Sequence, residues 1–453
     1  MSGARPPFGR LLAEAAAVVV LVVVTIGLRR IDGADGLHGS PLFSLGFLVI
    51  AGSALGSAAA FCRLPRLTGY LVAGLLAGPQ GTGFLAASDV KSLSLINALA
   101  HALIGLQAGA ELTVASLRRT WRSVTSSSLA QVVVVVPIMA GLFVLVAPQM
   151  PFVADLPAAA VIAIALLWGV LSLTRSPAVT LAILGETKAK GPVAEHALGV
   201  VVLLDVLALP LFAAAMAVGR GQLAGHPFEP AVFAQLAHDL FASVCAGVTF
   251  GLVIALLWRL VTKERVLMVV VVSYAVTALS TWLHYDTLLV FVVAGFVVMN
   301  LTRLGHELVE TSQRTSAGVM IVFFATAGAK LDLQALRELW GVVLLFFCIR
   351  AVVTWVACQL GHRLARDPPV VTRYGFSAFV SQAGVTIGLA TIVADSLPGV
   401  GKDLSTLVIA VVGLNELVGP VIFSWGLRRA KETEGSASVD GPPLSTTTAQ
   451  AGA

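Results

Sequence analysis

The chain has 453 residues, of which 57% are hydrophobic and only 12% are charged. Soluble proteins carry about 25% charged residues, so the composition excludes a soluble globular protein and indicates a polytopic membrane protein. The formal net charge of +5 is too small to indicate a nucleic-acid partner. The four cysteines lie in apolar runs without metal-ligand spacing, so we expect no metal site and no cofactor.

Fourteen membrane-spanning helices are predicted, since a spanning helix needs roughly 20 mostly apolar residues. In chain order they cover residues 11–28, 42–62, 67–86, 92–110, 123–147, 157–184, 193–218, 235–260, 266–283, 286–301, 316–330, 338–361, 373–395 and 404–427. The first is interpreted as a retained helix rather than a signal peptide, because it contains Glu14 and no clear cleavage site follows it.

The loops between these helices differ in their content of lysine and arginine. With the N-terminus in the cytoplasm, twenty of these residues fall on the cytoplasmic side and seven on the outer side. The asymmetry predicts an even number of spans in the plasma or bacterial inner membrane, with both termini cytoplasmic. The segment 431–453 is rich in Ser, Thr, Gly and Pro and is expected to be a disordered tail.

Two of the predicted helices are interrupted by polar residues. The sixth contains "TRSP" at 174–177, and the thirteenth contains "SQAGVTIG" at 381–388. They lie seven helices apart and so have opposite orientations in the membrane. Paired interruptions of this kind indicate the binding site of a transporter built from inverted repeats.

The predicted fold is therefore an all-α membrane protein with an inverted repeat of six-helix halves and two unwound helices that cross. The expected organisation is an extra N-terminal helix and loop (1–41), a first repeat (42–218), a linker helix (219–265), a second repeat (266–430) and the tail (431–453).

Four ionisable residues lie near the middle of predicted helices: Arg175, Asp205, Arg350 and Glu416. Each costs about 2.5–3.5 kcal/mol at the centre of a bilayer, so each is a functional candidate. Asp205 has no polar neighbour within five residues on either side, so its partner is another helix or a transported ion. A carboxylate poised to titrate near neutral pH holds either a proton or a small cation, which is the physical basis of proton-coupled cation exchange. The alternative is a structural ion pair, such as Asp205 with Arg350.

Several stretches of the chain resemble a known superfamily. They are "RLPRLTGYLVAGLLAGPQGTG" at 63–83, "LIGLQAGAEL" at 103–112, "TRSPAV" at 174–179, "LDVLALPLFA" at 204–213 and "VFFATAGAKLDLQAL" at 322–336. Over about residues 45–430 the chain is similar to the monovalent cation:proton antiporters, and within them to the second family, which includes Kef-type potassium efflux proteins. The resemblance implies a homodimeric elevator-type exchanger, with a dimerisation domain and a moving core in which two unwound helices cross.

The resemblance also implies roles for individual residues. Asp205 matches the acidic residue that binds the ion and the proton, and Arg350 matches the basic residue that balances it. The chain departs from the family pattern at Leu204, where a first acidic residue is usual, and at Arg175, where an aspartate is usual. With one carboxylate and a permanently charged Arg350, electroneutral exchange is expected. Arg175 needs a counter-ion, for which Glu416 and Asp205 are the candidates.

The predicted function is antiport of Na⁺ or K⁺ against protons across a lipid bilayer, with no enzymatic activity because no catalytic constellation is visible. The expected ion and proton site comprises Asp205, Thr174, Ser176, Ser381, Gln382 and Thr386, with Arg350, Arg175 and Glu416 balancing charge. Two alternatives stay open. One is a transport-inactive or regulatory membrane protein of the same fold. The other is a carrier of anions or organic solutes in which Arg175 and Arg350 form the site.

Overall fold

A computed structural model describes residues 41–224, 231–261, 264–283, 285, 287–302, 305–331, 339–382 and 384–433, together with Ala16 and Val20. Within these residues every regular element is a helix. Thirteen of the fourteen predicted segments fall, in order, on helices or on interrupted helices. The first predicted segment, 11–28, lies outside the described residues except for Ala16 and Val20. Six of the described helices are long and apolar enough to cross a membrane, and six shorter ones are also apolar.

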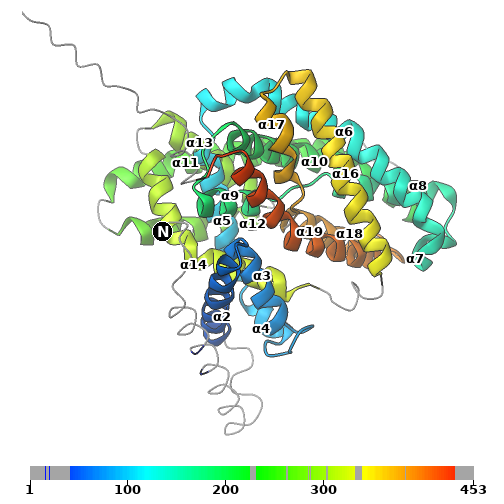
Figure 1. The fold of residues 1–453 in the computed structure, drawn as a ribbon, viewed down its shortest axis with the longest axis horizontal. Coiled ribbons are helices and arrows are strands. Elements are labelled where there is room, and N and C mark those ends of the chain that lie inside the picture. The colour runs from blue at the N-terminus through cyan, green and yellow to red at the C-terminus, as the bar shows by residue number, and fades with distance from the viewer. Residues whose placement is uncertain are drawn as a thin grey trace, which may run out of the picture.

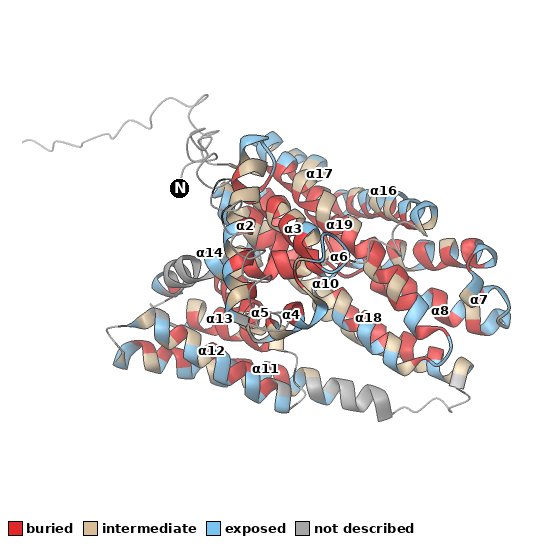
Figure 2. Ribbon diagram, turned by 90° about the horizontal axis from the view of Figure 1, so that it is seen from below, coloured by how far each residue is buried: buried red, intermediate tan, exposed pale blue. Residues whose placement is uncertain are grey.

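The described helices form two groups along the long axis of the molecule (Figures 1 and 2). The first group comprises α2 (Pro41–Phe61), α3 (Arg66–Ala77), α4 (Ala87–Ser92), α5 (Ser94–Glu111), α11 (Ala231–Leu260), α12 (Arg265–Trp282), α13 (Thr287–Leu301) and α14 (Gly305–Ala329). The second comprises α6 (Val114–Val146), η1 (Ala147–Gln149), α7 (Pro151–Ala154), α8 (Ala158–Leu171), α9 (Pro177–Thr187), α10 (Pro192–Ala224), α16 (Trp340–Ala365), α17 (Pro369–Tyr374), η2 (Gly375–Phe379), α18 (Gly384–Ser396) and α19 (Gly401–Arg429).

Each predicted six-helix half supplies helices to both groups. In the first group α5 packs on α13 and α3 packs on α14, which pairs a helix of the first half with one of the second. In the second group α6 packs along α16, α8 packs against both α6 and α10, and α18 lies against α19. The helix α11, which lies in the predicted linker, packs on α13.

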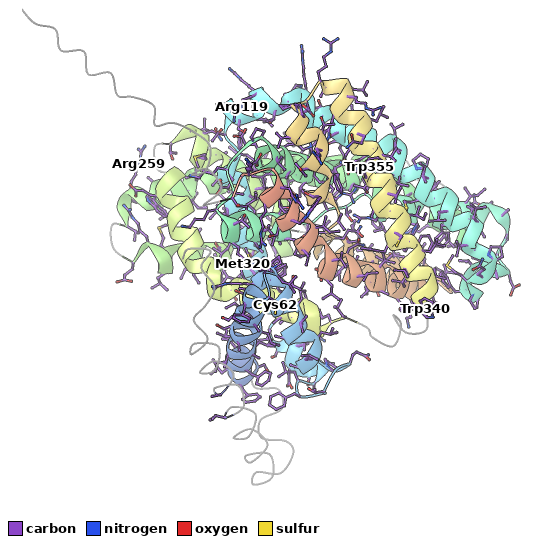
Figure 3. The ribbon with its side chains drawn as sticks, viewed as in Figure 1. Cys62, Arg119, Arg259, Met320, Trp340 and Trp355 are labelled. Atoms are coloured by element: carbon purple, nitrogen blue, oxygen red, sulfur yellow. The ribbon has the colours of Figure 1, made fainter. Side chains whose placement is uncertain are left out.

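Burial is concentrated between the helices (Figure 2). Many large hydrophobic side chains are exposed on their outward faces. In the second group Phe143, Trp168 and Phe346 pack together, with the rings of Trp168 and Phe346 4.3 Å apart. On the outside of α16, Trp340 and Trp355 are 66% and 45% exposed (Figure 3). An apolar exterior around a tightly packed interior is what a lipid bilayer requires as solvent.

The chain after α19 is held against the start of α10. Glu432 is buried, and its carboxylate accepts hydrogen bonds from the backbone N–H groups of Val193 at 2.8 Å and Ala194 at 2.9 Å. A carboxylate there satisfies donors that the first turn of a helix leaves without partners. Glu432 belongs to the segment that we expected to be a disordered tail, so the ordered part of the chain extends at least to Thr433. Residues 434–453 lie outside the described part.

Candidate functional site

The first interruption separates α8, which ends at Leu171, from α9, which begins at Pro177. Ser176 is extended, with φ −112° and ψ 100°, which is the conformation that a following proline favours. Its hydroxyl accepts a hydrogen bond from the backbone N–H of Val179 at 3.1 Å. A serine N-cap followed by proline at the first helical position is a strong helix start. The "TRSP" sequence therefore builds a new helix N-terminus inside a predicted span.

The second interruption lies between η2, which ends at Phe379, and α18, which begins at Gly384. The two interruptions meet. The hydroxyl oxygens of Thr174 and Thr386 are 2.6 Å apart, and the Gln382 amide donates to the Leu171 carbonyl at 2.9 Å and to the Thr174 hydroxyl at 3.3 Å. All three side chains are buried. The polar residues that interrupt two distant helices are thus in direct contact.

Arg350 of α16 ties the two interruptions together. Its buried guanidinium donates to the carbonyls of Ser172 at 2.9 Å and Val380 at 2.8 Å, and more weakly to that of Thr174 at 3.3 Å. A further hydrogen bond, at 3.1 Å, goes to the side-chain oxygen of Asn415. Helix interruptions leave carbonyls without their helical partners, and an unsatisfied carbonyl in a membrane costs several kcal/mol. Arg350 satisfies such carbonyls on both sides of the crossing.

Arg175 is fully buried and hydrogen-bonded to neutral groups. Its Nη2 donates to the Gln131 side-chain oxygen at 2.7 Å and to the Thr354 hydroxyl at 3.3 Å, while Nη1 donates to the Ser172 carbonyl at 3.2 Å. Ser172 is at the C-terminal end of α8, where the helix dipole is negative and favours a cation. The end of α8 and the amide of Gln131 therefore supply much of the stabilisation that this charge requires.

Asp205 lies on α10, which packs against α8, α9, η2 and α18 and so borders both interrupted helices. The residue is half-buried as a whole, but both oxygens of its carboxylate are buried, as are Arg175 and Arg350. Asp205 interacts electrostatically with Arg175. Pro210 lies within α10 and has no backbone N–H, so the carbonyl of Val206 lacks its helical donor. A carboxylate and a freed carbonyl are thus neighbours on one helix, and both are oxygen ligands of the kind that hard cations bind.

The sequence profile described as "Sodium/hydrogen exchanger, transmembrane" matches residues 46–429, which is most of the chain. The chain belongs to this family. A comparison with curated protein sequences finds no match.

Among solved structures, this family member is similar to the sodium proton antiporter MjNhaP1 from Methanocaldococcus jannaschii. The structure at pH 8 aligns with a TM-score of 0.64 at 14% identity, covering 87% of this chain and 99% of that one. A structure of the same antiporter from an electron-microscopy map gives a TM-score of 0.69 at 14% identity, with coverages of 86% and 96%. These alignments establish that the chain has the antiporter fold.

Glu416 does not join the crossing of this exchanger family member. It is buried on α19 and interacts electrostatically with Lys330 at the end of α14. Its neighbour Asn415 points to the crossing instead, donating to the Gln382 side-chain oxygen at 2.9 Å and accepting from Arg350. Successive residues of a helix point about 100° apart, so only one of the two can face the crossing. We expected Glu416 to be a possible counter-ion of Arg175, and these contacts do not support that expectation.

The remaining predicted residue, Ser381, is buried beside α19. A side chain at Gly419 would come within 2.2 Å of the Ser381 hydroxyl, so glycine is needed for this close approach. The structure therefore brings Thr174, Gln382, Thr386, Arg350 and Arg175 into one hydrogen-bonded network, with Ser176 and Ser381 at its edges.

Three members of the network were missed from the sequence: Gln131, Thr354 and Asn415. Gln131 directly precedes the run "VVVVV" in α6, and Asn415 directly precedes Glu416 in α19. Burying an amide side chain in an apolar membrane helix costs free energy, as burying a charge does, although the cost is smaller. By this cost Gln131 and Asn415 stand out in the sequence. Thr354 gives no such signal, because threonine is common in membrane helices and packs between them.

Proposed function

We propose that this protein is a secondary active transporter that exchanges a monovalent cation, Na⁺ or K⁺, for a proton. The observation that carries the proposal is the contact between two interrupted helices, at the Thr174 and Thr386 hydroxyls, in a member of the sodium/hydrogen exchanger family. Interrupted helices present hydroxyls, carbonyls and helix ends at membrane depth, and these are the groups that coordinate ions in transporters. The protein would act in the cell inner or plasma membrane, with both termini in the cytoplasm.

In this mechanism Asp205 binds the proton and the cation alternately. Its buried carboxylate lies on a helix that borders the crossing, and it interacts electrostatically with Arg175. Thr174, Ser176, Ser381, Gln382 and Thr386 line the crossing, and with nearby carbonyls they would complete the coordination. Because one carboxylate cannot hold both ions, binding of the cation releases the proton and the reverse step returns it.

We infer that the exchange is electroneutral, with one proton for each cation. The position before Asp205 is Leu204, which is fully buried and cannot take a second proton. Arg175 and Arg350 stay charged throughout, because the guanidinium is effectively always protonated. The loaded site therefore carries the same charge with a cation as with a proton. A membrane potential imposed on proteoliposomes without a gradient of the transported cation should leave the rate unchanged, whereas an electrogenic exchanger would respond to it.

The two groups of helices suggest how access alternates. The second group holds the interrupted helices with Asp205 and Arg350, while the first group has its own buried clusters, such as Ala102, Leu106, Phe291 and Ala294. We propose that the second group moves against the first in an elevator-type motion, and that the first mediates formation of a homodimer. Cross-linking the two groups should abolish exchange without affecting cation binding.

Transport in proteoliposomes tests the proposed function directly. An imposed pH gradient should drive cation-dependent proton movement, and comparing Na⁺, K⁺ and Li⁺ identifies the cargo. Asp205→Asn should abolish this movement, whereas Asp395→Asn, on α18 and outside the crossing network, should retain it. Full exchange by Asp205→Asn would overturn the assignment of Asp205. A folded wild-type protein that moves no cation would instead favour a regulatory role.

A carrier of anions is disfavoured by the hydrogen bonds of the two arginines. Nη1 of Arg350 donates to protein oxygens at 2.8 and 3.1 Å, and both terminal nitrogens of Arg175 also donate to protein oxygens. An anion that bound these guanidiniums would have to displace groups that are buried and would then lack partners.

A further inference from the structure

A second polar cluster lies near the N-terminal end of α10. The two imidazole rings of His196, on α10, and His362, on α16, meet edge to face, with their Nε2 atoms 3.0 Å apart. Both histidines are fully buried. Asp367, in the turn between α16 and α17, lies beside them. One potential ligand atom from each of the three residues lies within 4.8 Å of those of the other two. None of these residues belongs to the crossing network.

We propose that His196, His362 and Asp367 form a binding site for a transition-metal cation of the Zn²⁺ class. Two imidazole nitrogens and a carboxylate are the ligands that Zn²⁺ takes, with a fourth position open to water. Two nitrogens on a tetrahedral zinc ion are about 3.3 Å apart, given Zn–N distances of about 2.0–2.1 Å. The observed separation of 3.0 Å is close to that value. This proposal goes beyond the proposed exchange, because it concerns a different part of the molecule.

The hydrogen bonds around the cluster orient its ligands. The Ser123 hydroxyl donates its one hydrogen to the Asp367 carboxylate, at 2.7 Å. In its second contact, also at 2.7 Å, the Ser123 oxygen therefore accepts a hydrogen bond from the Nδ1–H of His196. His196 therefore carries its proton on Nδ1 and presents a lone pair at Nε2, toward His362. Ligating histidines typically donate their second ring nitrogen to such a partner, which fixes the tautomer that binds the metal.

The backbone gives the rings room and gives an ion a way in. A side chain at Gly375, in η2, would come within 3.0 Å of the His362 ring and 3.3 Å of the His196 ring. Asp367 lines an open groove of about 480 Å³ together with Trp355, Gln359, Thr372 and Arg373. The Arg373 guanidinium in this groove stacks on the Tyr374 ring, at 5.5 Å. An ion can thus reach the carboxylate from outside while the histidines stay buried.

An ion in this site would connect helices that carry the transport charges. His196 precedes Asp205 by nine residues, about 14 Å along α10, and His362 follows Arg350 by twelve residues, about 18 Å along α16. A metal bound by both histidines would hold α10 and α16 in one relative position. We therefore expect the metal to stabilise the protein against heat.

Metal binding to the purified, chelator-treated full-length protein tests the proposal without any transport assay. Competition with a chromophoric chelator should give one Zn²⁺ per chain, and Co²⁺ should give the visible absorption of a tetrahedral site. Mg²⁺, which demands octahedral oxygen ligands, should neither bind nor compete. His362→Gln and Asp367→Asn should each weaken Zn²⁺ binding at least about 10-fold, while His238→Gln, at an exposed position on α11, should leave it unchanged.

The outcomes separate this proposal from the proposed exchange. If a histidine variant fails to fold, Asp367→Asn still decides, because Asp367 is half-buried in a turn. Wild-type protein that takes up less than one Zn²⁺ per chain, or variants that bind as tightly as wild type, would overturn the metal site. Neither result bears on whether Asp205 exchanges cations.

Discussion

Arg175 and Gln131 are joined by two hydrogen bonds, from Nη2 at 2.7 Å and from Nε at 3.3 Å, both to the amide oxygen of Gln131. The arginine that departs from the family pattern is thus held by a neutral side chain from α6. In our account it acts as a fixed positive charge at the C-terminal end of α8. Asp205 therefore does not have to neutralise it alone.

Replacing Gln131 tests this relationship. Gln131→Leu removes the acceptor of a buried guanidinium, and a hydrogen bond to a charged group contributes about 1.5–3 kcal/mol. We expect a clear fall in thermal stability, measured by size-exclusion chromatography of samples after heating. Gln131→Glu, which keeps an acceptor and adds a charge, should be less damaging. Equal stability of wild type and Gln131→Leu would show that Arg175 does not depend on this contact.

The crossing itself makes a second prediction. Thr174→Val and Thr386→Val each remove one side of the 2.6 Å hydroxyl contact while keeping the shape of the side chain. Their effects should not add fully, because after the first substitution the hydrogen bond between the two hydroxyls is already lost, although Thr174→Val also removes the hydroxyl that accepts from Gln382. A double-mutant cycle should give a coupling energy of about 0.5–1.5 kcal/mol. Additive effects on thermal stability would mean that the two hydroxyls are close without stabilising each other.

Arg350 should not tolerate substitution by lysine. A lysine keeps the charge, but its ammonium cannot span the carbonyls of Ser172 and Val380 as the planar guanidinium does. We expect Arg350→Lys to lower both thermal stability and the rate of exchange. Arg363→Lys, at an exposed position on the same helix, is the matched control. Normal exchange by Arg350→Lys would show that only the charge of residue 350 matters.

Glu432 should make stability depend on pH. Burial raises the pKa of Glu432 above its usual 4.5, although hydrogen bonds from Val193 and Ala194 act in the opposite direction. Above pH 4.5 the unfolded chain therefore releases this proton before the folded protein does, so the free energy of unfolding falls as pH rises through the interval between the two pKa values.

A glutamine at position 432 removes that contribution. Melting temperatures measured from about pH 4.5 to about pH 7 should therefore fall less steeply for Glu432→Gln than for wild type. Identical slopes for the two proteins would show that this carboxyl does not titrate differently in the folded state.

The sequence predicted the helices and the interruptions because both are local. An apolar run of sufficient length must be helical in a membrane, and "TRSP" contains its own helix start in Ser176 and Pro177. The contacts between Thr174, Gln382 and Thr386 followed from pairing the two interruptions in an inverted repeat.

The partners of the charges were harder to predict, because they depend on how helices rotate against one another. Glu416 and Asn415 are adjacent in sequence, yet only Asn415 faces Arg350. Likewise, nothing local indicates that Gln131 would meet Arg175, since 44 residues separate them. The cluster of His196, His362 and Asp367 could not be predicted either, because its residues are far apart in sequence and their spacing resembles no metal-binding motif.

Cation-induced proton release from the purified protein tests the central claim most directly. In a weakly buffered detergent solution near neutral pH, adding the transported cation should release protons from wild-type protein, because Asp205 exchanges one ion for the other. Asp205→Asn should release none, while Gln131→Glu should still respond. Proton release by Asp205→Asn equal to that of wild type would contradict the account.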